Sequence, residues 1–297
     1  MRIAIASGKG GTGKTTIAVG LFLSLASLPV GERPKVLQFL DCDVEEPNAA
    51  IFLDPVIEGE EEVGILLPEV DLDRCTYCGI CAEVCAFHAI AVMGKRVLVF
   101  PQLCHGCGSC AYNCPEGAIR ERLNPTGVIS WGHLDGYAEV EYGQGELKVG
   151  EAMATPVIRQ LKQRFSGRED ALMILDAPPG NACPVVETLR GADFALLVTE
   201  PTPFGLHDLR VAVEMARDEL GIPVGVVINR DGIGDTGVET FCAEADVPIL
   251  MRIPLDRHIA EAYADGTPVV MARPEYRQAF VELYAEMRRM ARKEVAA

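Results

Sequence analysis

The sequence predicts an α/β fold, in which a parallel sheet carries helices on both faces and is interrupted by a small inserted domain. Towards both ends of the chain, short continuous apolar runs alternate with helical patterns, as is typical of strands buried on both sides. Between these parts the alternation stops, and eight of the 11 cysteines lie there, from Cys75 to Cys114. We therefore expect a first α/β part over residues 1–58, an inserted domain over 59–123, and a second α/β part over 124–297.

The first α/β part has the pattern of a strand–helix–strand unit. An apolar strand is expected over residues 2–6, a helix from Lys14 to about Leu28 follows a glycine-rich loop, and a second strand covers 35–40. After the cysteine-rich segment, alternating residues over 128–149 predict a strand or a hairpin. The remaining elements are expected to be apolar strands at Ala171–Leu175, Phe194–Thr199, Val224–Ile228 and Ile249–Ile253, and a final helix over 275–294.

Composition and charge exclude several classes of function. The formal net charge of −16 would repel phosphate backbones, so no nucleic-acid partner is expected. No apolar run reaches the ~18 residues of a membrane span, and the first residues lack the apolar core of a signal peptide. We therefore expect a cytoplasmic protein without membrane association. In such a reducing compartment, clustered cysteines are expected to bind metal rather than to form disulfides.

A phosphate-binding loop is predicted between the first strand and the first helix. Residues 8–15 fit the pattern G-x-x-x-x-G-K-[ST]. Glycines in such a loop let backbone N–H groups turn towards phosphate oxygens, and the start of the following helix favours negative charge. Lys14 can reach the β- and γ-phosphates, and the Thr15 hydroxyl can ligate Mg²⁺. The predicted nucleotide-binding residues here are Gly8, Lys9, Gly10, Gly11, Thr12, Gly13, Lys14, Thr15 and Thr16.

A second lysine within this loop carries a family resemblance. Lys9 to Thr16, read as Lys-Gly-Gly-Thr-Gly-Lys-Thr-Thr, resembles the deviant Walker A motif of the MinD/ParA/Mrp and nitrogenase-iron-protein ATPases. The resemblance implies a P-loop ATPase that hydrolyses ATP to ADP with Mg²⁺, slowly without a partner, and forms an ATP-dependent homodimer. It also implies that Lys9 and Lys14 are catalytic, with Lys9 reaching across the dimer to the other subunit's phosphates. The alternative for Lys9 is a solvated loop charge.

Three aspartates that follow apolar strands match positions of the same family. Asp41 and Asp43 end the second strand, and Asp176 ends a later one. The resemblance implies that Asp43 positions the attacking water, a role that suits a carboxylate acceptor near the γ-phosphate. It also places Asp41 and Asp176 with Thr15 at the magnesium ion. A single aspartate at a strand end is usually a turn residue, so the inference depends on the phosphate loop.

Two further positions resemble the adenine-binding residues of the family. Asn229 follows one apolar strand and Pro254 ends another, although both residue types are common in turns. The stretch from Ile253 to Ala262 resembles the Mrp branch in particular. The resemblance spans residues 1–48 and 154–270.

The clustered cysteines form two runs with one spacing. Each run reads C-x₂-C-x₂-C-x₃-C, and the second follows 29 residues after the first. This spacing resembles that of two-cluster bacterial ferredoxins, in which the fourth cysteine of each run ligates the other cluster. A pair of zinc sites is the rival interpretation, but zinc does not require the third and fourth cysteines of each run. The expected [4Fe–4S] ligands are Cys75, Cys78, Cys81 and Cys114 for one cluster, and Cys104, Cys107, Cys110 and Cys85 for the other.

Taken together, the motifs resemble MinD-superfamily ATPases that contain an inserted ferredoxin domain. The resemblance implies that nucleotide-dependent dimer closure is coupled to electron transfer through the two clusters, with a redox or iron–sulfur partner protein that the sequence does not identify. The alternative is an iron–sulfur cluster carrier or assembly ATPase, or a MinD-like positioning ATPase with a structural ferredoxin module. A carrier should lose its clusters to an apo-acceptor, whereas an electron-transfer protein should keep them.

Overall fold

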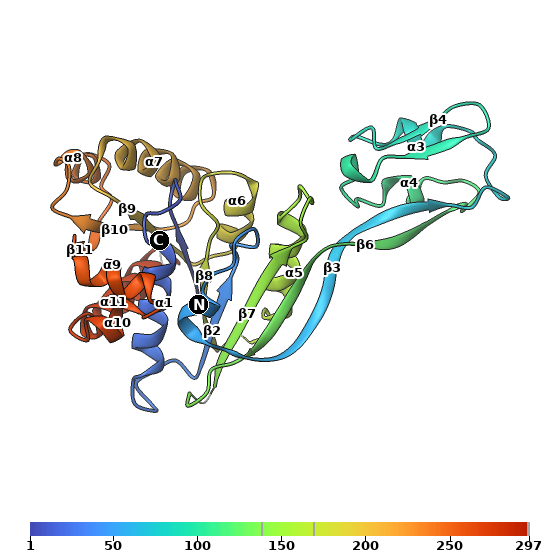
Figure 1. The fold of residues 1–297 in the computed structure, drawn as a ribbon. Coiled ribbons are helices and arrows are strands. Elements are labelled where there is room, and N and C mark those ends of the chain that lie inside the picture. Colours follow the sequence, from blue (N-terminus) through green and yellow to red (C-terminus); the bar gives the residue numbers. More distant parts are fainter. Residues whose placement is uncertain (138, 169, 296–297) are drawn as a thin grey trace.

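A nine-stranded sheet forms the centre of the molecule in the computed structural model, which describes residues 1–137, 139–168 and 170–295 (Figure 1). Seven neighbouring strands run parallel, and two strands at one edge pair antiparallel. In order across the sheet, the strands are β11 (Ile249–Pro254), β10 (Val224–Asp231), β9 (Phe194–Thr199), β1 (Arg2–Ala6), β8 (Ala171–Asp176), β2 (Val36–Asp41), β7 (Val140–Leu147), β6 (Ile119–His133) and β3 (Val56–Val70).

Helices cover both faces of this sheet and enclose two hydrophobic cores. In β1, Ile3 and Ile5 point into one core while Ala4 and Ala6 point into the other, and all four are at most 1% exposed. The isoleucine side packs against α1 (Lys14–Ala26), α2 (Ala50–Leu53), α9 (Arg257–Ala264), α10 (Val269–Ala272) and α11 (Tyr276–Val295). The alanine side packs against α5 (Thr155–Arg164), α6 (Cys183–Leu189), α7 (Pro203–Val213) with its π-helical end (Glu214–Glu219), and α8 (Gly237–Glu244).

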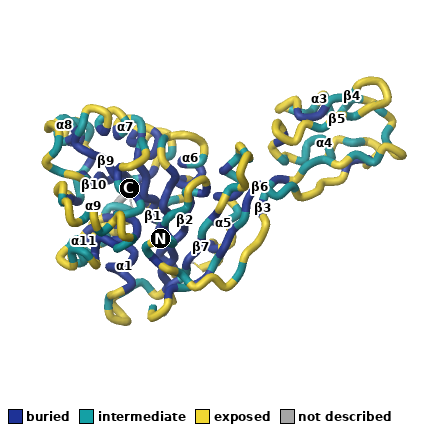
Figure 2. Tube along the Cα trace, in the orientation of Figure 1, coloured by how far each residue is buried: buried dark blue, intermediate teal, exposed yellow. Residues whose placement is uncertain are grey.

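The two edge strands continue beyond the sheet as a two-stranded arm. β3 and β6 pair antiparallel along their whole length, from Val56↔His133 to Val70↔Ile119. β6 also pairs with β7, but only from Gly127 onwards, so the rest of the ribbon has no neighbouring strand. Figure 1 shows this ribbon leaving the main body, and Figure 2 shows that it is far less buried than the sheet.

A small lobe sits at the end of the arm. It contains α3 (Ile80–Glu83), β4 (Ile90–Val92), β5 (Val97–Val99), a 3₁₀ turn (Pro101–Leu103) and α4 (Ser109–Tyr112). Its buried hydrophobic residues are few: Ala89, Ile90, Cys104, Ala118 and Ile119. So small a core gives little stabilisation by itself, and lobes of this size usually depend on a bound metal or a cross-link.

The predicted α/β fold, with a mostly parallel sheet and helices on both faces, is confirmed. All the strands expected from apolar runs form, and the last helix begins at Tyr276. The predicted boundaries at 58/59 and 123/124 fall inside continuous strands, because β3 and β6 cross from the sheet into the arm. Within the described part of the chain, no helix has the length and apolarity that a membrane span requires.

Candidate functional site

The glycine-rich loop connects β1 to α1 at the carboxyl edge of the parallel strands. Gly11 and Gly13 adopt left-handed backbone conformations, with φ of 77° and 94°, which glycine adopts without strain. A Cβ at Gly13 would collide with the side-chain amide of Asn229. That amide donates a 2.8 Å hydrogen bond to the Thr12 carbonyl oxygen, so Asn229 fastens the loop to β10.

A cavity of about 1270 Å³, a volume that includes space open to solvent, lies over this loop. Most of the residues predicted to bind nucleotide line it: Gly10, Gly11, Gly13, Lys14, Thr15, Thr16, Asp43, Asn229 and Pro254. Five predicted residues do not: Gly8, Lys9, Thr12, Asp41 and Asp176. The sequence reasoning missed several lining residues, among them Glu46, Asn48, Arg230, Asp256 and Tyr263, because no motif marks them.

Asp41 and Asp176 lie side by side at the ends of adjacent parallel strands, and both are fully buried. The Asp41 carboxylate accepts hydrogen bonds from the backbone N–H groups of Asp43, Asn48 and Ala49 at 3.0–3.1 Å. Neither carboxylate oxygen of Asp176 has a hydrogen-bond partner among the described protein atoms. Burial raises the pKa of Asp41 to about 7, and burial together with the Asp41 charge raises that of Asp176 well above its usual value.

This pair of carboxylates fits a divalent cation. A buried carboxylate with no donor is costly unless a proton or a cation compensates it. Thr15 and Lys14 are the nearby groups that favour the ionised form of Asp176. Asp43 lines the cavity. Burial raises the pKa of its carboxyl to about 6, although the nearby positive charge of Lys14 lowers it.

Lys9 does not line the cavity, and it forms an ion pair within its own chain. Its Nζ lies 3.2 Å from Oε2 of Glu200, at the end of β9. Arg230, which lines the cavity, pairs with the other oxygen of the same carboxylate. The Glu200 side chain is 8% exposed and Lys9 is 33% exposed, so one nearly buried carboxylate holds two cations.

The eight clustered cysteines divide between two hollows in the lobe. The outer hollow, of about 370 Å³ including open space, is lined by Cys75, Cys78, Cys81 and Cys114. The inner hollow, of about 390 Å³ including open space, is lined by Cys85, Cys104, Cys107 and Cys110. These are the two sets expected from the spacing, including the exchange of the fourth cysteine between runs.

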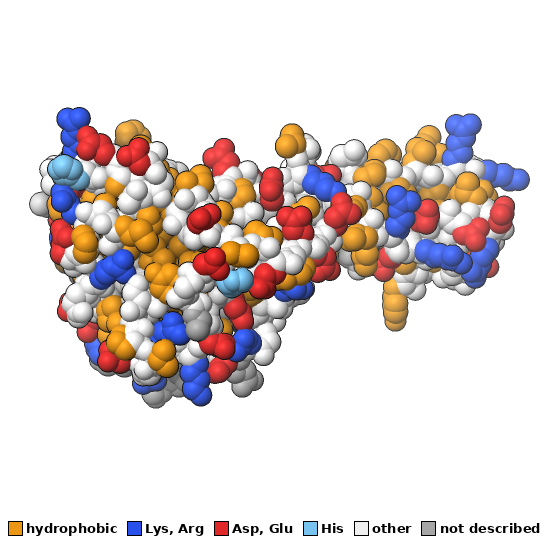
Figure 3. All heavy atoms as spheres, turned by 60° about the horizontal axis from the view of Figure 1, so that its bottom comes forward, with side chains coloured by type: hydrophobic (Ala, Val, Ile, Leu, Met, Phe, Trp, Pro, Cys, Tyr) orange, Lys and Arg blue, Asp and Glu red, His pale blue; other side chains and the backbone are white. Residues whose placement is uncertain are grey.

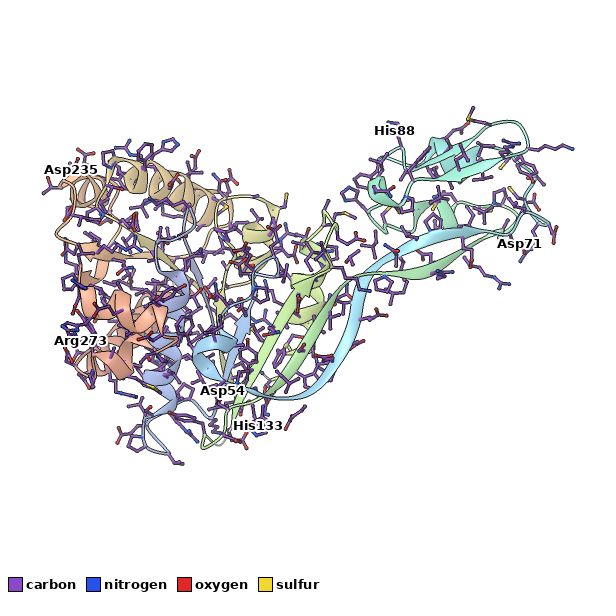
Figure 4. The ribbon with its side chains drawn as sticks, viewed as in Figure 1. Asp54, Asp71, His88, His133, Asp235 and Arg273 are labelled. Carbon is purple, nitrogen blue, oxygen red and sulfur yellow. The ribbon has the colours of Figure 1, made fainter. Side chains whose placement is uncertain are left out.

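The two hollows occupy different positions along the arm. Leu66, Pro68 and Glu121 border the inner hollow, whereas the last pair of the ribbon, Val70 and Ile119, borders the outer one. The inner hollow is therefore nearer the main body. Figure 4 agrees, since His88 lies on the side of the lobe facing the body and Asp71 lies at its far end.

Backbone N–H groups point at cysteine sulfurs in a pattern that the two runs share. The first cysteine of each run accepts from the residue two positions on, at 3.4 and 3.5 Å. The fourth accepts from the residue four positions on, at 3.2 and 3.3 Å. Hydrogen bonds to the sulfurs are one of the features that set the reduction potential of iron–sulfur sites. The left-handed residues also repeat: Tyr77 with Gly106, Gly79 with Gly108, and His88 with Gly117.

In the described residues, no three His, Cys, Asp or Glu side chains converge on a point as the ligands of one metal ion do. The eight cysteines line the walls of the two hollows. The sequence reasoning missed the Phe87 ring at the inner hollow, which stacks on His105 at 3.8 Å between centroids.

Comparisons with known proteins agree with this architecture. The model of the CobQ/CobB/MinD/ParA nucleotide binding domain matches residues 3–269. An uncharacterised protein of Methanocaldococcus jannaschii is 31% identical over 90% of both chains. An iron–sulfur cluster carrier protein of Pyrococcus abyssi is 26% identical over 91% of this chain and 79% of its own.

Among solved structures, the septum site-determining protein MinD of Pyrococcus horikoshii, in complex with Mg-ADP, superposes with a TM-score of 0.57 at 22% identity. The alignment covers 96% of this chain and 94% of that protein. At this identity the likeness shows the fold alone. With the phosphate loop, the parallel sheet and the matched family model, the chain belongs to the CobQ/CobB/MinD/ParA nucleotide-binding family.

Proposed function

We propose that this protein is an ATP-dependent iron–sulfur cluster carrier, in which a MinD-like ATPase presents [4Fe–4S] clusters on a projecting lobe. The observation that carries the proposal is the division of eight cysteines into two hollows of four, on an arm attached to a nucleotide-binding fold. The relative in Pyrococcus abyssi that is named an iron–sulfur cluster carrier favours the same reading. The middle ligands Cys78 and Cys107 are exposed, which gives an acceptor protein access to each cluster.

The nucleotide part of the proposal uses residues of the cavity. Lys14 and the N–H groups of the loop would hold the phosphates, and Thr15, Asp41 and Asp176 would hold Mg²⁺. The ion would supply charge neutralisation at the β- and γ-phosphates. Asp43 accepts a hydrogen bond from the attacking water, for which it must be ionised. Asn229 and Pro254 border the space that remains for the adenine.

The dimer part of the proposal concerns Lys9. For Lys9 to reach a second subunit's phosphates, it must leave Glu200. Arg230 remains with Glu200 when it does, so the nearly buried carboxylate is never left unpaired. Closure of the homodimer on ATP and its reopening after hydrolysis would then change how the two arms are presented to a partner protein.

Electron transfer is the second candidate function. It is favoured by two complete cysteine sets in one small lobe, with backbone N–H groups directed at the first and fourth sulfur of each run. Hydrogen-bonded, cross-ligated clusters of this kind are typical of stable redox centres. In that case the ATPase would gate the access of an electron donor or acceptor to the lobe.

One experiment separates the two functions. Anaerobically purified protein, loaded with about eight irons per chain if both clusters are present, is mixed with an apo-aconitase, with and without Mg-ATP. Aconitase activity that rises as this protein loses iron supports the carrier. Full retention of iron and of the reduced EPR signal through repeated reduction cycles, with no aconitase activity, would transfer the assignment to electron transfer. Fewer than four irons per chain would contradict both.

A further inference from the structure

The two cysteine runs are held in equivalent backbone frames. The N–H of Asp71, ahead of the first run, donates a 2.7 Å hydrogen bond to the carbonyl oxygen of Ala118, beyond the second run. At the corresponding positions of the repeat, the N–H of Phe100 donates to the carbonyl oxygen of Ala89 at 2.8 Å. Each bond joins the loop of one run's first cysteine to the loop of the other run's fourth cysteine, and these two cysteines line the same hollow. The side chains, by contrast, differ between the two hollows.

At the inner hollow, an aromatic pair connects these two loops. Phe87 follows Cys85, the fourth cysteine of the first run, by two positions, and His105 directly follows Cys104, the first cysteine of the second run. The two rings stack with their centroids 3.8 Å apart and their planes at 18°, and both residues line the inner hollow. Cys104 itself is buried, at 9% exposure. The stack therefore fastens together the two segments that carry Cys85 and Cys104, beside a ligand that is already shielded from water.

At the outer hollow, the positions that correspond to the two rings carry Glu116 and Thr76, which have no rings to stack. A side-chain contact between the loops exists there too, but it is an exposed hydrogen bond of 2.7 Å from the Arg74 guanidinium to the carbonyl oxygen of Glu116. Cys75, the counterpart of Cys104, is only partly buried. In Figure 3, basic side chains gather over the outer part of the lobe. In such a polar setting water competes for an exposed hydrogen bond, so its net contribution is small.

A hydroxyl adds a second difference in the same direction. The Oγ of Ser109 lies 3.5 Å from the Sγ of Cys107, which lines the inner hollow, within hydrogen-bonding reach of the sulfur. The corresponding residue of the first run is Ile80, which has no hydroxyl. Acidic side chains do not distinguish the hollows, because each wall contains one glutamate, Glu116 at the outer hollow and Glu121 at the inner one. The cysteines of the inner hollow are thus the more firmly held set.

We propose that the outer site gives up its cluster while the inner site keeps its own, with Phe87 and His105 as the positioning residues that retain the inner cluster. This inference rests on the proposed carrier function and names the site that delivers. A departing cluster must break its bonds to both loops, so a contact between the loops opposes its loss by keeping the ligands in place. Stacked rings add an attraction of their own to the apolar area that they bury. The middle cysteine is exposed at both sites, so its exposure does not select between them.

Release from the outer site is a ligand exchange in which no atom changes its oxidation state. The bonds from iron to four cysteines break, four bonds to acceptor cysteines form, and the acceptor's four thiol protons pass to the released thiolates. The released cysteines are Cys75, Cys78, Cys81 and Cys114. Because the inner cluster stays bound, the protein would deliver one cluster, about four irons per chain, for each loading.

The test follows the loss of iron from anaerobic holoprotein, with about eight irons per chain, to an excess of the Fe(II) chelator bathophenanthroline disulfonate. F87A removes the stack, whereas F87Y keeps an aromatic ring in its place. R74Q is the matched control, because it removes the polar contact at the other hollow. The absorbance of the chelate times the release. The EPR spectrum of the reduced protein identifies the cluster that remains, with C78S and C107S as the references for the inner and the outer cluster alone.

We expect the wild type to release its iron in two phases of about four irons each, and the spectrum left after the first phase should match that of C78S. F87A should accelerate the second phase about 10-fold, the effect of losing one aromatic pair, and leave the first phase unchanged. F87Y should behave as the wild type, and R74Q should accelerate only the first phase, by about 2-fold. Release in a single phase, loss of the inner cluster first, or equal acceleration of both phases by F87A overturns the inference.

An apo-ferredoxin with four cysteines then replaces the chelator, so that the carrier function is tested separately. The wild type should load this acceptor with about four irons per chain and stop, whereas F87A should continue towards about eight. Ordered release to the chelator without any loading of the apo-ferredoxin would uphold the difference in retention and contradict the carrier function. Fewer than about four irons on the isolated protein would contradict both.

Discussion

Lys9 and Arg230 share one carboxylate, and this arrangement makes the release of Lys9 inexpensive. The Glu200 carboxylate is nearly buried. If Lys9 were its only partner, the departure of Lys9 would leave a desolvated charge without a counter-ion. With two partners, the departure of Lys9 leaves the bond from Arg230 in place. In the proposed dimer closure, Lys9 would exchange Glu200 for phosphate oxygens of the other subunit while Arg230 keeps the carboxylate paired.

Replacing Glu200 by Gln should free Lys9 and lower the ATP concentration needed for dimer formation by about 5-fold, the effect of removing roughly 1 kcal/mol of competing attraction. Analytical ultracentrifugation with a slowly hydrolysed ATP analogue measures this. Glu239→Gln is the matched control, because Glu239 pairs with Arg252 at 2.9 Å on a neighbouring strand. An equal shift in the control, or a shift that persists in the Lys9→Ala background, would argue against storage by Glu200.

The buried aspartates predict an unusual pH dependence. The pKa of Asp41 is raised to about 7 in the folded, metal-free state, so that state binds more protons than the unfolded chain between about pH 4 and pH 7. Stability is therefore greatest below the unfolded pKa and is lost as pH rises, by up to about 1.4 kcal/mol per pH unit for each such carboxyl. The thermal unfolding midpoint of the metal-free protein should therefore decrease as the pH is raised from 5.5 to 7.5.

Magnesium should reverse that trend, because the cation replaces the protons on Asp41 and Asp176. The stabilisation by Mg-ADP should thus be larger at pH 7.5 than at pH 5.5, and binding should release protons that calorimetry in two buffers detects. Replacing both Asp41 and Asp176 by Asn should remove most of the pH dependence. A thermal midpoint that rises with pH in the absence of metal would contradict the assignment.

The position of a single residue in the site could be predicted where a sequence motif defines it, but not where the packing of distant segments brings it there. The phosphate loop placed Lys14 and Thr15 at the cavity, because the spacing itself defines the loop. Asn229 was expected near the adenine, yet its amide also fastens the loop through the Thr12 carbonyl, a contact across 217 positions of sequence. Glu200 carries no motif, and only the fold shows that it meets Lys9.

Among the elements, the cysteine runs make the sharpest prediction. If the fourth cysteine of each run serves the other cluster, Cys114→Ser should disrupt the outer cluster, whose other ligands lie 33 to 39 positions earlier. The iron content should fall from about eight to about four per chain. The EPR spectrum of Cys114→Ser should lose the outer-cluster signal, which is the signal that Cys78→Ser also removes. It should keep the inner-cluster signal, which Cys107→Ser removes. Cys183→Ser, at an exposed cysteine outside the lobe, should keep all its iron. If Cys114→Ser instead removed the signal that Cys107→Ser removes, the exchange of the fourth cysteine between the two runs would be ruled out.

The edge strands were the hardest elements to predict. Residues 58–62 are mostly glutamate and lack the apolar signal that marked the central strands. They form part of β3 because an edge strand needs only one neighbour and can carry charge on its exposed side. Gly59 lies against the indole of Trp131 on β6, which fixes that part of the pairing. Central strands such as β8 were predicted closely, because burial on both faces requires continuous apolar residues.

At the scale of the whole molecule, the lobe should be removable. Val63 pairs with Gly127 where β6 joins the sheet, so an Asn-Gly turn joining residues 63 and 127 should close a shortened hairpin. We expect the shortened protein to bind Mg-ADP with an affinity within about 3-fold of the full chain, since no cavity-lining residue is lost. Isothermal calorimetry measures this. Cuts at the predicted limits, 58 and 124, should give a less stable protein, because they remove part of β3 from the sheet.

The arm also acts as a lever. Beyond Val63, the seven remaining residues of β3 extend about 23 Å before the lobe begins. A bend of 10° at the foot of the ribbon would therefore displace the lobe by roughly 4 Å, and a twist would turn the mouth of the outer hollow towards a new direction. A two-stranded ribbon resists stretching, because that would break its cross-strand hydrogen bonds, but it yields readily to bending and torsion. Small rotations within the body, between one nucleotide state and another, would therefore produce larger changes in the position and orientation of the lobe.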